Sequence, residues 1–134
     1  MLFRSHVATG AAGGALVRSR LGSLALGPLL HLAGDLMPHE DIVDRRFEIG
    51  SGVAAVVLLA AVRGPLDPAV TGALAASAPD LEHVVPFLRV GGRKHFPSHR
   101  LHGWHRSGGM RAPVQLLVAG FLIGLLLRSR PRLD

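Results

Sequence analysis

The sequence has no cysteine and no tyrosine, and its aromatic residues are five phenylalanines and one tryptophan. Without cysteine, disulfide scaffolds, thiolate zinc sites and cysteine nucleophiles are excluded. Charged residues are also scarce, at 18% of the chain, where a soluble domain usually has about a quarter. With 49% hydrophobic residues and a mean hydropathy of +0.36, the chain does not belong to the disordered class. A core with few aromatics and 17 glycines favours closely packed helices over a β-sandwich.

Lysine is nearly absent too: Lys94 is the only one, so arginine sets the net charge of +6. A basic balance is typical of chains that bind nucleic acid or anionic lipid. Nucleic acid is not the expected partner, because aromatic side chains for base stacking are scarce and the basic residues are divided between both ends of the expected bundle. The eight histidines among 134 residues are the more unusual feature.

Five apolar stretches, separated by short polar breaks, indicate helices. They cover residues 6–17, 21–37, 49–62, 69–78 and 113–127. The longer ones are continuous rather than alternating and too long for typical strands, and Asp67-Pro68 is a helix-start signal. The length is that of one domain. We therefore expect an all-α fold over residues 1–134, a compact bundle of about five antiparallel helices, with a His/Arg-rich loop at 89–111.

The apolar stretches also raise the question of a membrane. Helices of this length reach about 21–26 Å, short of the hydrocarbon core of about 30 Å, although flanking arginines can snorkel. The pairs Gly10/Gly14 and Gly120/Gly124 have the spacing that lets helix backbones approach closely, a spacing that also arises by chance in a glycine-rich chain. We expect the bundle to be membrane-embedded or membrane-associated, with membrane lipids as partners.

The polar residues predict a site at one end of this bundle. Antiparallel threading brings every histidine, and seven of the nine acidic residues, to the same end. There, His31 and Asp35 lie four residues apart on one helix face, among apolar neighbours where an unpaired carboxylate is costly to bury. A cluster of His, Asp and Glu without Cys has the composition of a metal site with nitrogen and oxygen ligands. The alternative is a polar helix end without an ion.

Two further segments supply candidate ligands. In Pro79-Asp80-Leu81-Glu82-His83, three candidate ligands follow a helix directly. The same segment can be an ordinary capping turn in which Asp80 accepts backbone N–H groups, and the two roles are compatible. The segment 94–106 contains four histidines with two arginines; the alternative is a solvated basic loop or a phosphate-binding patch.

Taken in order, these segments resemble a known family. His6 before a Gly/Ala-rich helix, then HLAGDLMPHED, then APDLEH, then a His/Arg-rich loop before a last apolar helix, are similar to the small bacterial membrane-bound metal-dependent hydrolases. These include the LexA-binding, inner-membrane-associated hydrolases. The family's Pro-Asp-x-Asp-His segment is matched by residues 79–83, with Glu82 for the second Asp. Its His-Arg-x-x-x-His-Ser segment is matched loosely by His99-Arg100, which His102 and His105 follow at other spacings. The His-x-x-x-Asp pair is also weakly similar to zinc-dependent phospholipase C.

Residues and resemblance together predict one or two divalent ions, zinc first, in a protein of the bacterial inner membrane. The predicted metal ligands are His6, His31, Asp35, Asp80, His83 and His99. Glu82 is predicted to act as a general base or to orient a ligand, and Arg100 to bind an anionic group. We expect the loop 95–106 to complete the site through His99. His39 and Asp41 are further candidates for orienting a ligand or acting as a general base, and the roles of His39, His95, His102 and His105 are not decided by the sequence.

The expected activity is metal-assisted hydrolysis of a phosphoester, of a lipid or another anionic substrate, or of a similar bond. Two alternatives stay open. One is a non-enzymatic membrane protein with a structural or sensing metal site, and the other is a membrane protein that binds a regulator. The oligomeric state is not predicted.

Overall fold

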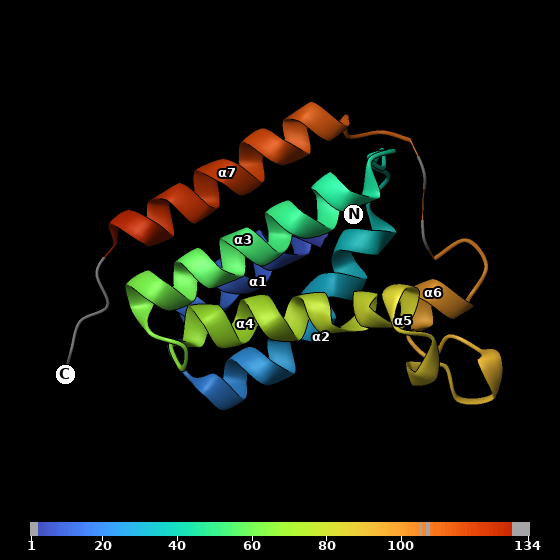
Figure 1. Ribbon diagram of the computed structural model, residues 1–134, viewed down its shortest axis with the longest axis horizontal. Helices are drawn as coiled ribbons and strands as arrows, with labels where there is room; N and C mark the ends of the chain where they lie inside the picture. Colours follow the sequence, from blue (N-terminus) through green and yellow to red (C-terminus); the bar gives the residue numbers. More distant parts are fainter. Residues whose placement is uncertain (1–2, 105, 107, 130–134) are drawn as a thin grey trace.

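The computed structural model describes residues 3–104, 106 and 108–129, which form helices and no β-strand (Figure 1). Five long helices account for most of the chain: α1 (Phe3–Val17), α2 (Arg20–Leu36), α3 (Arg45–Arg63), α4 (Pro68–Ser77) and α7 (Ala112–Arg128). Between α4 and α7 lie two short α-helices, α5 (Leu81–Val84) and α6 (Pro97–Arg100), and three 3₁₀ turns, Ala78–Asp80, Pro86–Leu88 and Val90–Gly92. The predicted all-α fold is confirmed, and each of the five apolar stretches forms a helix.

Side-chain caps explain where two of these helices begin. Asp67 accepts the backbone N–H of Ala69 at 2.8 Å, so the predicted Asp-Pro start of α4 is confirmed. Asp44 accepts the N–H groups of Arg46 and Phe47, so α3 begins at Arg45, before the predicted apolar stretch 49–62. Such caps satisfy donors that have no partner within the helix.

Small residues let α1 and α4 approach closely. A Cβ atom at Gly10 would collide with the carbonyl oxygen of Gly72, and one at Gly14 with that of Pro68. The facing side of α4 is accordingly built from fully buried alanines such as Ala73. The glycine pair on α1 thus has the close-packing role that its spacing predicts. The pair on α7 does not: a Cβ at Gly120 or Gly124 meets no described atom within 4 Å.

These two pairs supply a matched test of the packing. We predict that Gly10→Ala lowers the free energy of unfolding by about 1–3 kcal/mol, because the added methyl overfills the α1–α4 contact. Gly120→Ala should leave stability unchanged or raise it by about 0.5–1 kcal/mol, since alanine is the better helix former and the site is open. Urea unfolding followed by circular dichroism measures both. Equal losses in the two variants would contradict the packing described here.

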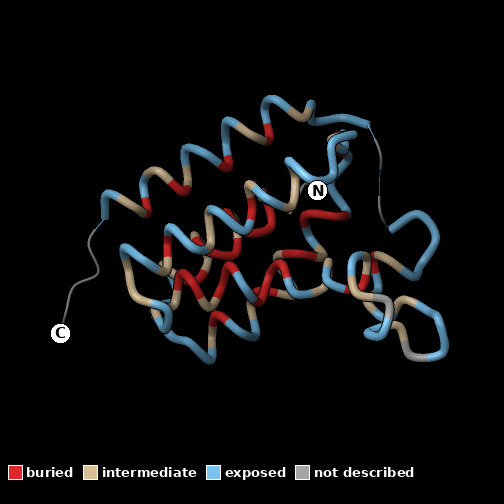
Figure 2. Tube along the Cα trace, viewed as in Figure 1, coloured by how far each residue is buried: buried red, intermediate tan, exposed pale blue. Residues whose placement is uncertain are grey.

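The last long helix, α7, packs against α1 and α3 through one side only. Figure 2 shows its buried positions recurring on the side that faces the other helices. They are Gln115, Ala119, Ile123 and Leu126. None of the helices in the described ranges combines the length and the hydropathy needed to cross a bilayer. The 17 residues of α7 extend about 26 Å, short of a hydrocarbon core of about 30 Å, so the predicted membrane spans find no support.

The arrangement gathers the polar segments as the threading predicts. In Figure 1, α5 and α6 lie beside the end of α2 and the start of α1, at one end of the bundle. The short connections 18–19 and 64–67 lie at the opposite end. One end of the bundle therefore contains the segments that supply the predicted site.

Candidate metal centre

His31 and Asp35 occupy the last two turns of α2, and their side chains are 0% and 1% exposed. His31 Nδ1 lies 2.7 Å from the carbonyl oxygen of Ala76, at the end of α4. Because a carbonyl oxygen can only accept, Nδ1 donates and holds its proton there. The other ring nitrogen, Nε2, faces Asp35 Oδ2 at 3.1 Å.

His99, from α6, is oriented in the same way by Glu82. Its Nδ1 lies 2.7 Å from Glu82 Oε1, and Glu82 also accepts the backbone N–H groups of His95 and Phe96, at 2.8 and 3.2 Å. Burial alone would raise the pKa of Glu82, but these hydrogen bonds hold it below its usual value. Glu82 is therefore an ionised acceptor, His99 Nδ1 is the donor, and His99 Nε2 points into the cluster.

The two Nε2 atoms lie only 3.2 Å apart. Since each ring already uses its Nδ1 proton elsewhere, two neutral imidazoles present lone pairs to each other, and a positive charge is needed between them. Asp35 Oδ2 lies 3.1 and 3.4 Å from the nitrogens of His31 and His99, and Asp80 Oδ1 lies 3.8 and 3.7 Å from them. Ligands about 2.0–2.1 Å from a tetrahedral zinc are about 3.3 Å apart, which these distances bracket.

Asp80 contributes to this cluster rather than to a cap. It precedes α5 but makes no side-chain capping hydrogen bond, so the alternative of an ordinary capping turn is wrong. Its Oδ2 is buried and has no hydrogen-bond partner among the described residues. Burial raises the pKa of Asp80 to about 6, as expected for a carboxylate that lacks a neutralising partner. With 21% of its side chain exposed, Asp80 is the most accessible member of the cluster.

His6 and Ser98 also contact Asp35, each at a different carboxylate oxygen. Ser98 Oγ donates to Asp35 Oδ2 at 2.6 Å, and His6 Nε2 lies 3.2 Å from Asp35 Oδ1. The His6 ring stacks on His31 with centroids 3.8 Å apart. Burial lowers the pKa of His6 to about 3, so the ring is neutral. Its Nδ1 is buried without a partner in the described part of the chain.

Two overlapping groups in this cluster have ligand atoms within 4.8 Å of one another. They are His6 with His31 and Asp35, and His31 with Asp80 and His99. Five of the six predicted ligands are thus brought together from α1, α2, the turn after α4, and α6. These buried groups can hold a metal ion, whose identity the geometry alone does not decide. Ser98 is the contributor that sequence reasoning missed, because a single serine gives no signal of a metal centre.

The sixth predicted ligand, His83, lies beside the cluster and belongs to neither group. Its ring meets that of His99 edge-on, with centroids 4.1 Å apart, and Lys94 Nζ donates to its Nδ1 at 3.2 Å. Burial lowers the pKa of His83 to about 4, which keeps it neutral. Arg100 is exposed on α6, and its predicted role in binding an anion stays a prediction.

Of the remaining described histidines, one is buried and connects two segments, and the others are exposed. His39 is buried: its Nδ1 donates to the Met37 carbonyl at 2.7 Å, and its backbone bonds to that of Arg106 and Gly108. It thereby joins the chain after α2 to the loop before α7. His95 and His102 are exposed, and His105 lies outside the described residues.

A cleft with a volume of about 430 Å³ reaches the cluster at Asp80 and His99. His83 also lines it, and the cluster is open to this cleft at Asp80 and His99. Comparisons with protein-family models, curated sequences and solved structures find no match to this chain. What the centre does must therefore be argued from its own geometry.

The position of Glu82 predicts an orienting role that can be measured. Glu82→Gln should lower zinc affinity by about 10–100-fold, because the amide replaces the ionised acceptor that fixes the His99 ring. The control is Glu40→Gln, which changes an exposed carboxylate that also accepts a backbone N–H, that of Ala112 at the start of α7, at 3.3 Å. Competition with a fluorescent zinc chelator measures both. Unchanged affinity in Glu82→Gln, or the same loss in the control, would refute the role.

Proposed function

We propose that this chain is a divalent-metal-dependent hydrolase that holds its cation between His31 and His99. The observation that carries the proposal is the 3.2 Å separation of their Nε2 atoms. In each ring the other nitrogen, Nδ1, already donates its proton, to the Ala76 carbonyl in His31 and to Glu82 in His99. Such a pair is stable only with a positive charge between the rings. A divalent cation bound between the two nitrogens would supply that charge.

The charges of the cluster support a dication. With neutral imidazoles, Asp35 and Asp80 together carry two negative charges, and Asp80 Oδ2 still lacks a partner. Two imidazoles with two carboxylates are a donor set that suits zinc among the first-row ions. When bound, the cation would supply a Lewis acid that acidifies water and polarises a phosphoryl or carbonyl oxygen. His6 and Ser98 would orient Asp35, and Glu82 would orient His99.

Accessibility supports hydrolysis over a purely structural role. A structural zinc site is closed by protein ligands, whereas a catalytic one keeps a position for water or substrate. Here His31, His99 and Asp35 would supply three ligands, and the fourth position would lie beside Asp80, whose Oδ1 is farthest from the two nitrogens, at 3.8 and 3.7 Å, where the cleft meets the cluster. The resemblance to membrane-bound metal-dependent hydrolases supports the same activity, on a phosphoester or a similar bond.

Metal analysis tests the first part of the proposal. Wild-type protein is expected to retain about one or two zinc ions per chain after dialysis, measured by elemental analysis. His31→Ala should lose most of that metal, because it removes a central ligand. His102→Ala is the matched control, since it deletes an exposed histidine outside the cluster and should keep full metal content. Equal metal content in wild type and His31→Ala would overturn the proposal.

The hydrolytic part needs a second measurement on the same proteins. Zinc-loaded wild type and His102→Ala should hydrolyse an activated phosphodiester such as bis-p-nitrophenyl phosphate, and His31→Ala should not. Full zinc occupancy without turnover of activated phosphoesters, carboxylic esters or amides would instead favour the structural or sensing alternative.

We also propose that the protein associates with a lipid bilayer, as the sequence predicts for a protein of the bacterial inner membrane. The support comes from α7, whose outward side is a second apolar stripe. Its exposed members are Val114, Leu117, Val118, Phe121 and Leu125. A soluble helix is normally polar on its outer side, and exposed apolar surface of this kind indicates contact with a membrane or a protein.

Flotation with phosphatidylethanolamine/phosphatidylglycerol vesicles tests this association. Wild type should float with the vesicles, and Phe121→Asp should lower the bound fraction about tenfold or more, because the aromatic ring leaves the hydrocarbon. Phe87→Asp makes the same exchange at another exposed phenylalanine, away from α7, and should bind as wild type does. A wild-type protein that stays unbound, or dimerises through α7 without lipid, would contradict the proposal.

A further inference from the structure

The cleft beside the metal centre has mostly apolar walls. They come from the start of α3, from the chain before it, from α5, and from the first residue of α1 that the structure describes. The apolar lining residues are Phe3, Ile42, Val43, Ile49, Val53, Leu81 and Val84. Its volume of about 430 Å³ falls within the range of small-molecule sites, about 300–1,000 Å³. A metal centre that acts only on small polar substrates has no need of such walls.

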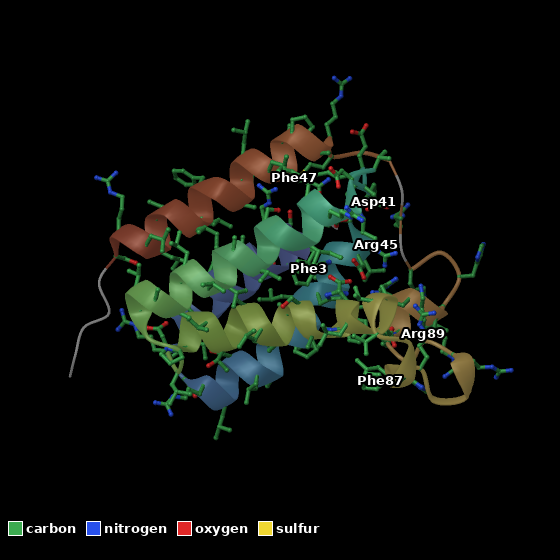
Figure 3. All side chains as sticks on the ribbon, in the orientation of Figure 1. Phe3, Asp41, Arg45, Phe47, Phe87 and Arg89 are labelled. Carbon is green, nitrogen blue, oxygen red and sulfur yellow. The ribbon has the colours of Figure 1, made fainter. Side chains whose placement is uncertain are left out.

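The walls are held in place by contacts that cross between elements. The backbone N–H of Phe3 donates to Glu48 Oε1 at 3.0 Å, which joins α1 to α3. The Phe3 ring lies against Gly52, where any larger residue would displace it. Figure 3 shows Phe3, Asp41 and Arg45 beside the first turns of α3. Phe3 is therefore fixed between α1 and α3 at one wall of the cleft.

The polar lining of the cleft includes the carboxylates Asp41 and Glu48, so an anionic head would be attracted only at the end where Arg45 and the proposed cation lie. Arg45 lines the cleft, and its Nη2 donates to the carbonyl oxygen of His83 at 3.1 Å, so the guanidinium extends from α3 to α5. The guanidinium has further N–H donors for a phosphate-type group. Asp80 and His99, at the same cleft, belong to the proposed cation site. A dication and Arg45 together would attract an anion to this end of an otherwise apolar cleft.

We infer that the cleft binds the hydrocarbon chain of an amphiphilic anionic substrate, whose phosphate-type head lies at the metal centre beside Arg45. This inference rests on the proposed metal-dependent function and adds a substrate class to it. The head would contact the cation and Arg45, and the chain would lie against the apolar side chains of α3 and α5. The substrate is accordingly an alkyl or acyl phosphoester rather than a small polar one.

Binding of n-alkylphosphonates, from methyl to octyl, tests the inference without assuming which bond is cleaved. Titration calorimetry with the zinc-loaded protein should show affinity rising about fourfold for each added methylene until the cleft is full. Arg45→Gln should weaken every member of the series by a similar factor of about ten, because it removes a contact with the head alone. Metal-free protein should also bind every member more weakly, because the head group loses its contact with the cation.

Two valines one turn apart on α3 allow an effect of the cleft to be distinguished from an effect of the exposed surface in general. Val53 lines the cleft and is 49% exposed, whereas Val57 does not line it and is 61% exposed. Because both are half-exposed, Val53→Asn and Val57→Asn should both fold. Val53→Asn should flatten the dependence of affinity on chain length, and Val57→Asn should preserve it.

The outcomes separate the inference from the function on which it rests. Affinity that does not depend on chain length, in a protein that holds zinc, overturns the substrate class and leaves the metal function standing. Chain-length dependence that survives Val53→Asn overturns the cleft as the binding place. A protein that binds no zinc overturns the proposed function, and this inference with it.

Discussion

Two histidine nitrogens that face each other across 3.2 Å set the requirements for the side chains around them. Each imidazole has one proton to give, and each gives it outward: His31 to the Ala76 carbonyl and His99 to Glu82. The inward lone pairs then need a positive charge, and two carboxylates, Asp35 and Asp80, lie beside them. A site with neutral rings and no cation would be unstable, because like partial charges would meet in a buried place.

The packing of the helices supplies the outward acceptor of His31. Gly27 lies one turn before His31 on α2, and a Cβ atom there would collide with the backbone at Ala75 and Ala76. This close approach of α2 and α4 brings the Ala76 carbonyl to 2.7 Å from His31 Nδ1. Ala76 also faces α1: a Cβ atom at Gly10 would collide with the Cβ atom of Ala76. The glycines that allow close helix packing therefore also fix the Nδ1 proton of His31, a candidate metal ligand.

Sequence patterns predicted the parts of this site that follow from helix geometry. The four-residue spacing of His31 and Asp35 placed them on one face, and the alternation of helix direction gathered the polar segments at one end. His99 was predicted only through the resemblance of His99-Arg100 to a family motif, because spacing does not decide which histidine of the loop enters the site. That choice depends on Glu82, which binds the N–H groups before α6 and then the ring of His99, so His95 and His102 stay exposed. Helix spacing alone also could not show that Gly120 would face outward, because α7 is apolar on both sides.

The contacts that attach α6 to the bundle are the contacts that surround the proposed cation. Ser98 donates to Asp35, His99 faces His31, and the chain before α6 bonds to Glu82. A ligand that binds the folded arrangement and not the open one stabilises it by mass action. A cation between His31 and His99 would therefore also hold α6 against α2, and with it the side of the cleft that His99 lines. Metal binding would thus be coupled to the shape of the cleft, because His99 and Asp80 belong to the candidate cation site and also line the cleft.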